Sequence, residues 1–222
     1  MKKKEWLILA MGALACIAMS LIETVWKPVY FVKSALKVVI FLGTIGAVCV
    51  CTRTPIRELL NIRKPKKAKT LFWFLGLSYV AIIAGFFLFK NMIDLDTLRQ
   101  SLLDKEGLTK RNCLYVFSYI ILCNSFLEES FFRGFLFRGL KKNRRAAYLL
   151  SSLLFALYHI GIVGSWFNPL VLVVCIIGLM LAGIVLDFVS EHYDSLFASY
   201  AVHACANLAI NTIGVYMIFF AA

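Results

Sequence analysis

Long apolar runs follow one another along this chain, and each is long enough to cross a lipid bilayer or nearly so. There are seven, at about residues 6–26, 30–51, 70–89, 112–140, 146–161, 170–189 and 196–219. A transmembrane helix needs about 20 mostly apolar residues. A transmembrane β-barrel would instead alternate apolar and polar residues. The sequence therefore predicts an all-α fold, a polytopic transmembrane helical bundle of about seven spans.

Basic loops between the runs predict the orientation of the bundle. Residues 53–69 contain seven Lys or Arg against one Glu, and residues 141–145 contain four cations. Loops rich in Lys and Arg stay on the cytoplasmic side of the membrane. We therefore expect both loops and the N-terminus in the cytoplasm, with the chain integral to a prokaryotic plasma membrane. The net charge of +12 then indicates contact with anionic membrane lipid and not with nucleic acid.

Polar side chains divide the chain into two parts. Residues 1–111 carry no recognisable motif and are expected to control access of a substrate, whereas residues 112–222 carry a small set of polar groups inside apolar runs. These groups are Glu128, Glu129, Arg133, His159, His203 and Asn207. A charged side chain at the centre of a bilayer costs about 2.5–3.5 kcal/mol on insertion scales. A chain that keeps such groups there is expected to use them.

Depth in the membrane tests whether these groups can form one site. At a rise of 1.5 Å per residue, the polar residues lie roughly 11 to 20 Å from the inner ends of their predicted helices. Their depths are similar, so we expect a common site somewhat inside the cytoplasmic half of the bilayer.

Activation of water is the chemistry that such a cluster supports. A carboxylate beside a neutral imidazole can hold and deprotonate water, and a second imidazole and an amide can donate to the oxyanion that follows. Arg133 lies four residues after Glu129, the spacing of a helical ion pair. We expect this pair to keep Glu129 ionised and to leave Glu128 free as the general base, although the reverse assignment stays open.

Three motifs contain these residues: Glu-Glu-x-x-x-Arg at Glu128, Phe-x-x-x-His from Phe155 to His159, and His-x-x-x-Asn from His203 to Asn207. In this order on separate spans, they resemble the CPBP family. This family includes CAAX prenyl endopeptidases of the Rce1 type and the Abi bacteriocin-processing or immunity proteins. The resemblance covers about residues 114–212. It implies an intramembrane endopeptidase in which Glu and His activate water and His203 and Asn207 form an oxyanion hole. Phe155 would shape the pocket wall.

The resemblance leaves the cofactor and the substrate open. No cofactor is required on the preferred interpretation, but a zinc-dependent version would use Glu128, Glu129, His159 and His203 as ligands. The expected partner is a peptide or protein substrate, whether prenylated or otherwise associated with the membrane, cut near the cytoplasmic interface. The alternative is a non-proteolytic immunity protein or peptide-binding scaffold, in which the same polar residues form a structural ion-pair network.

Overall fold

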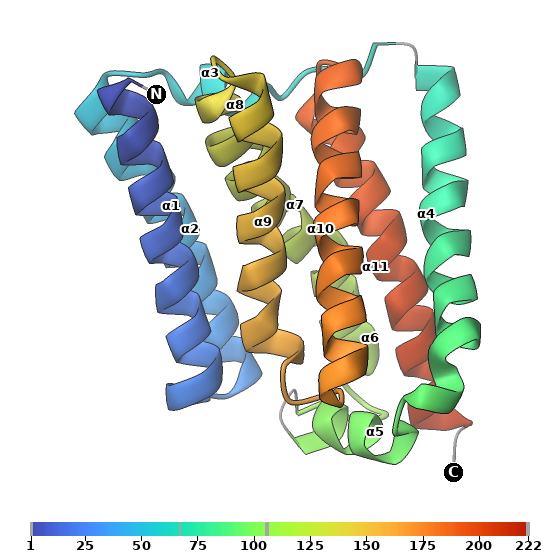
Figure 1. Ribbon diagram of the computed structural model, residues 1–222. Coiled ribbons are helices and arrows are strands. Elements are labelled where there is room, and N and C mark those ends of the chain that lie inside the picture. The colour runs from blue at the N-terminus through green and yellow to red at the C-terminus, as the bar shows by residue number, and fades with distance from the viewer. Residues whose placement is uncertain (1, 67, 105–106, 221–222) are drawn as a thin grey trace.

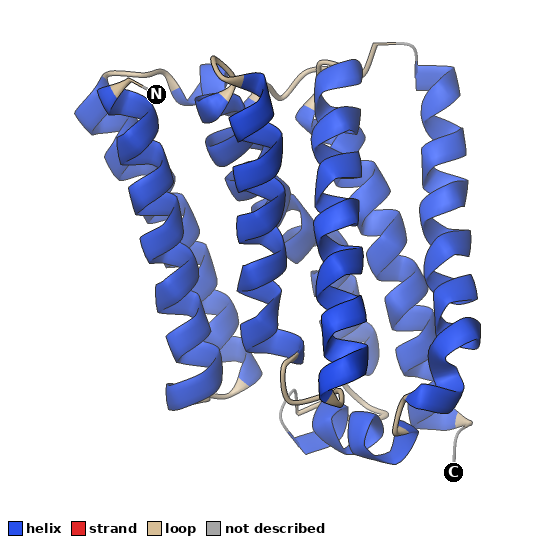
Figure 2. Ribbon diagram, in the orientation of Figure 1, coloured by secondary structure: helices blue, strands red, loops and turns tan. Residues whose placement is uncertain are grey.

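The computed structural model describes residues 2–66, 68–104 and 107–220, and it shows a bundle of long helices (Figures 1 and 2). Among these described residues, six helical segments are long and apolar enough to cross a membrane. They are α1 (Lys3–Leu21) with its π-helical extension η1 (Ile22–Trp26), α2 (Tyr30–Thr52), α4 (Ala68–Phe89), α9 (Arg144–Val163), α10 (Pro169–His192) and α11 (Leu196–Phe219). The described residues form no strand, as the apolar runs predict.

The fourth apolar run forms a seventh crossing from short consecutive pieces. These are α6 (Cys113–Tyr119), η3 (Ile120–Asn124), α7 (Ser125–Glu129), η4 (Ser130–Phe137) and α8 (Arg138–Leu140), of which η3 and η4 are π-helical. Among the described residues, the predicted all-α bundle of about seven spans is confirmed, and the observed ends lie within three residues of the predicted ones. The π-helical pieces were not predicted. Such turns occur mostly as short insertions, frequently at functional sites.

Short helices mark the two ends of the bundle. α3 (Ile56–Leu60) lies at the end that holds the N-terminus and the basic loops, whereas η2 (Lys90–Met92) and α5 (Leu95–Asp104) lie at the opposite end (Figure 1). We call these the inner and outer ends, since basic loops face the cytoplasm. Lys67, part of the predicted basic loop 53–69, lies outside the described residues.

Aromatic packing fills the inner half of the bundle beside the seventh crossing. Phe131, Phe132 and Phe135 of η4 are fully buried, and the Phe131 ring stacks on that of Phe41 from α2, with ring centroids 4.0 Å apart. This cluster joins α1, α2, α9 and η4. Because these residues follow the glutamate pair toward the inner end, they close the bundle on that side.

A glycine sets the distance between α9 and α10. A Cβ atom at Gly183 would come within 2.9 Å of the Cα atom of Ser152. The two helices therefore touch backbone to backbone, at a point where a larger residue would force them apart. This contact holds α9, which carries one of the predicted catalytic histidines, against α10.

Candidate active site

Side chains from three crossings meet around the glutamate pair. Glu128 and Glu129 end helix α7 and are almost fully buried, at 2% and 0% exposure. His159 of α9 places Nε2 3.8 Å from Glu128 Oε2, and His203 of α11 places Nε2 3.7 Å from the same oxygen. The structure thus brings together four of the residues that the sequence placed in one site.

The hydrogen bonds of the two histidines fix their tautomers. His159 Nδ1 lies 2.7 Å from the carbonyl oxygen of Phe155, and His203 Nδ1 lies 2.8 Å from Glu129 Oε1. Carbonyl and carboxylate oxygens accept hydrogen bonds, so both Nδ1 atoms carry the hydrogen. In each neutral ring the lone pair is then on Nε2, and both Nε2 atoms face Glu128 Oε2. Two bases and one carboxylate oxygen therefore converge on the same small space.

Glu129 belongs to a second layer of charge behind Glu128. Arg133 is fully buried, with Nη1 3.0 Å from Glu129 Oε1 and Nε 3.3 Å from Asp187 Oδ1 of α10. Its Nη2 donates to the carbonyl oxygen of Gly183 at 3.2 Å, and its guanidinium lies 4.4 Å from the ring centroid of Phe155. The expected pair of Glu129 and Arg133 is present. Asp187, to which the sequence analysis assigned no role, shares the same arginine.

Glu128 is also ion-paired, which corrects the expectation that it is free. Lys37 of α2 contacts Glu128 Oε1 through Nζ, and the same Nζ lies 2.5 Å from Asn124 Oδ1. Asn124 Nδ2 in turn donates to Glu128 Oε1 at 3.1 Å. The sequence did offer a signal, because Lys33 and Lys37 lie four residues apart inside the apolar run 30–51. The nearest cation to Glu128 is therefore distant in sequence.

Phe155 and Asn207 border the group of four. The Phe155 ring lies between the two imidazoles, with centroids 4.5 Å from His159 and 5.8 Å from His203. Asn207 Nδ2 donates to Ser125 Oγ at 2.8 Å, so the amide that the sequence placed in an oxyanion hole is here bonded to a hydroxyl group of α7. It lies one helical turn beyond His203 on α11.

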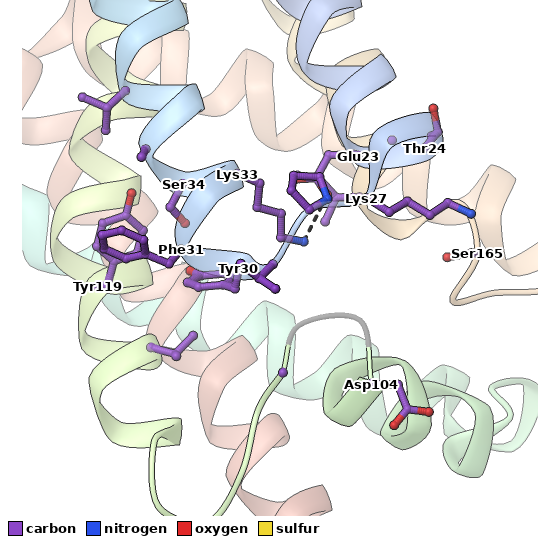
Figure 3. A pocket seen from close by; sticks show the side chains of 18 of the residues that line it. Glu23, Thr24, Lys27, Tyr30, Phe31, Lys33, Ser34, Asp104, Tyr119 and Ser165 are labelled. Carbon is purple, nitrogen blue, oxygen red and sulfur yellow. Dashed lines mark hydrogen bonds and ion pairs between the residues drawn. The ribbon is translucent and has the colours of Figure 1, made fainter.

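A cavity of about 1100 Å³ lies at the outer side of this group. Figure 3 shows it bordered by the outer ends of α1 and α2, with Tyr119 on one side and α5 beyond. Ser34 and Val38, on either side of Lys37 in sequence, contribute to its lining, as does Ile160 next to His159. The cavity thus reaches residues that are close in sequence to Lys37 and His159.

Helix ends place the site close to mid-depth. His159 is four residues from the outer end of α9 and Lys37 is seven from the outer end of α2, whereas His203 is seven from the inner end of α11. At 1.5 Å per residue these are about 6, 10 and 10 Å. His203 thus lies about as far from the inner end of its helix as the sequence analysis expected, and the group as a whole lies between the two ends of the bundle.

The fold and the buried group of carboxylates and imidazoles define a polytopic membrane protein with a polar site inside the bilayer. Residues 110–209 match the family described as type II CAAX prenyl endopeptidase Rce1-like. This segment, which contains all three motifs, is therefore similar to the Rce1-like family that the motifs indicated. The match indicates a membrane endopeptidase of the CAAX type. Neither a curated protein nor a solved structure matches the chain.

Proposed function

We propose that this protein hydrolyses a peptide bond inside the membrane with water activated by Glu128 and His159. The observation that carries the proposal is the convergence of two imidazole Nε2 atoms on Glu128 Oε2, at 3.7 and 3.8 Å. A water molecule in this space would find only acceptors around it, so it would donate its hydrogens to them. That is the arrangement of a general-base site.

The reaction follows from these positions. Glu128 takes a proton from the water that His159 orients, the resulting hydroxide attacks the peptide carbonyl carbon, and the proton passes to the leaving amine nitrogen. His203 can donate from Nε2 to the oxyanion only while its ring carries the proton on its way from Glu128 to the leaving amine. The carboxylate of Glu129, bonded to Nδ1, stabilises that imidazolium. Asn207 adds a second donor when it leaves Ser125.

A metal-independent mechanism fits the charges best. The donor set of one carboxylate and two imidazoles resembles that of a catalytic zinc site. However, Glu128 already holds the ammonium of Lys37, which would repel a divalent cation on the same carboxylate. Metal analysis of active protein, together with activity under chelation, distinguishes the two mechanisms.

The cavity beside the site supports a route for the substrate. Its volume of about 1100 Å³ exceeds the roughly 300–1,000 Å³ of small-molecule sites, so it can accept several residues of a peptide. Its lining residues include the outer ends of α1 and α2, whereas the phenylalanines of η4 fill the inner side. A membrane-associated peptide, with or without a prenyl group, is the substrate class that we propose. A substrate that follows this route enters from the outer side. The route therefore argues against cleavage near the cytoplasmic interface, which the sequence analysis expected.

Cleavage by purified protein in liposomes tests the proposal. A farnesylated CAAX peptide, its unprenylated counterpart and an apolar signal-like peptide are incubated with wild type, Glu128→Gln and His159→Ala, and products are identified by mass spectrometry. We expect both substitutions to abolish cleavage. His192→Ala is the matched control, because His192 lies at the inner end of α10 and stacks on Phe188. Full activity in Glu128→Gln would refute the proposal.

A non-proteolytic scaffold is the second candidate, and one observation favours it. Ion pairs run from Lys37 to Glu128 and from Arg133 to both Glu129 and Asp187, so they tie α2 and α10 to the broken crossing as a structural network would. Immunity or peptide binding in cells that survives Glu128→Gln in a folded protein would favour this candidate over the protease.

A further inference from the structure

Two buried lysines lie one helical turn apart on α2, and each has a carboxylate partner. Lys33 pairs with Glu23 of η1 at 3.1 Å, near the outer end of the bundle. Lys37 pairs with Glu128. A lysine inside a membrane helix is costly unless paired and often marks a functional site. Lys37 is of special interest because α2 lies outside the segment 110–209 that matches the family.

Contacts on several sides hold the Lys37 ammonium in place. Its residue is 6% exposed, and Nζ contacts Glu128 Oε1 and Asn124 Oδ1. The same Nζ lies 5.0 Å from the ring centroid of Tyr158 and 5.7 Å from that of Phe41, within the range of cation–π attraction. An ammonium with this many partners has little freedom to move.

As a result, the two carboxylate oxygens of Glu128 have different hydrogen-bond environments. Oε1 receives hydrogen bonds from both Lys37 and Asn124. Oε2 is buried without a hydrogen-bond partner among the described residues, and it is the oxygen that both imidazole Nε2 atoms face. A buried acceptor left without a donor is unfavourable, so an oxygen held in this way is poised to receive a hydrogen from a bound molecule.

We propose that Lys37 is a positioning residue of the active site: it anchors Glu128 through Oε1 so that Oε2 is presented to water between His159 and His203. This inference rests on the proposed function, whose base is Glu128. It gives α2 a direct part in the site, in addition to any part in substrate access. Asn124 completes the anchor from the same crossing as Glu128.

The experiment compares kcat, KM and stability for Lys37→Met, Lys37→Arg and Lys33→Met in the liposome cleavage assay. Displacement of a reacting group by about 1 Å costs about 10²-fold. We therefore expect Lys37→Met to lower kcat about 100-fold with little change in KM. Lys33→Met removes a similarly buried ammonium from the same helix without touching Glu128, so its loss of kcat should be at least tenfold smaller.

Chemical rescue separates positioning from a purely structural role. In Lys37→Ala, added methylammonium should restore at least a tenth of the wild-type kcat, because the cavity lined by Ser34 and Val38 gives a small cation a route to the vacated space. Ethanol, which is neutral and of similar size, should not. A structural role would leave kcat insensitive to either compound.

Several outcomes would overturn the inference. They are a folded Lys37→Met with kcat within threefold of wild type, an equal loss in Lys33→Met, or rescue by ethanol as strong as by methylammonium. If Lys37→Met does not fold, Lys37→Arg decides: a folded, charged variant with at least a tenth of the activity supports the inference, and one as inactive as Glu128→Gln refutes it. An active Glu128→Gln would instead refute the proposed function itself.

Discussion

Arg133 is the residue whose removal should disturb the folded bundle most. It is fully buried, and its guanidinium contacts the carboxylates of Glu129 and Asp187 at 3.0 and 3.3 Å as well as the carbonyl oxygen of Gly183. Replacement by methionine keeps much of the side-chain volume but removes the charge. The two carboxylates would then share a buried space without a cation.

The expected loss of stability in Arg133→Met follows from the cost of removing one partner of a buried ion pair. Removing one partner typically destabilises a protein by about 3–5 kcal/mol, because the other charge is left uncompensated. For a chain of 222 residues, a loss of 1 kcal/mol lowers the melting temperature by about 2–4 °C. Arg133→Met should therefore lower it by roughly 6 to 20 °C. Adding Asp187→Asn should recover part of this loss, since one of the two stranded charges disappears.

Thermal unfolding in detergent, followed by circular dichroism, measures the effect. Arg138→Met is the matched control, because Arg138 lies five residues further along and contacts Asp194 at 3.6 Å with its side chain 18% exposed. Such partly exposed pairs contribute at most about 1 kcal/mol. The account is refuted if Arg133→Met melts within 2 °C of wild type, or if Asp187→Asn deepens its loss.

Three further predictions concern helix packing, pH and the cavity. Gly183→Ala should lower the free energy of unfolding by about 1–3 kcal/mol by overpacking against α9, whereas Gly178→Ala on the same helix, with nothing within 4 Å of the added carbon, should not; denaturant titration compares them. A hydrogen bond from Lys66 lowers the pKa of Asp194. The ionised Asp194 carboxylate therefore stabilises the folded protein above the usual pKa of an aspartate, and this stabilisation is lost as the pH falls. Asp194→Asn should remove this part of the acid sensitivity, about 1 kcal/mol or less, and equal slopes of stability against pH below 5 in both proteins would contradict this. Ser34→Cys, in a chain lacking its native exposed cysteines, should react with a membrane-impermeant thiol reagent added outside intact cells; labelling only after permeabilisation would contradict an outward-opening cavity.

Much of the fold could be predicted because the membrane restricts it. Apolar runs of suitable length fixed the crossings, and basic loops such as 141–145 fixed their expected orientation. The π-helical pieces η3 and η4 (residues 120–124 and 130–137) could not be predicted, because they depend on how the crossing packs against its neighbours. Nothing in the spacing of residues within the fourth run distinguishes a π turn from an α turn.

The site was predictable where its residues share a motif and not where a partner is remote. The spacing of His159, His203 and the glutamate pair indicated a common site, and the structure brings them together. Lys37 was missed because neither it nor Lys33, in the same apolar run, has a partner that can be identified from spacing along its own helix. The expectation of a free Glu128 failed for the same reason, since it considered only the cation on the same helix, Arg133.

The most direct test of the central claim is a cleavage reaction in water enriched in ¹⁸O, followed by mass spectrometry of the products. If Glu128 and His159 activate water, one ¹⁸O atom should enter the new C-terminal carboxylate formed by wild type, and Glu128→Gln should form product at least about 10²-fold more slowly. Product formed by folded Glu128→Gln at the wild-type rate would contradict the account.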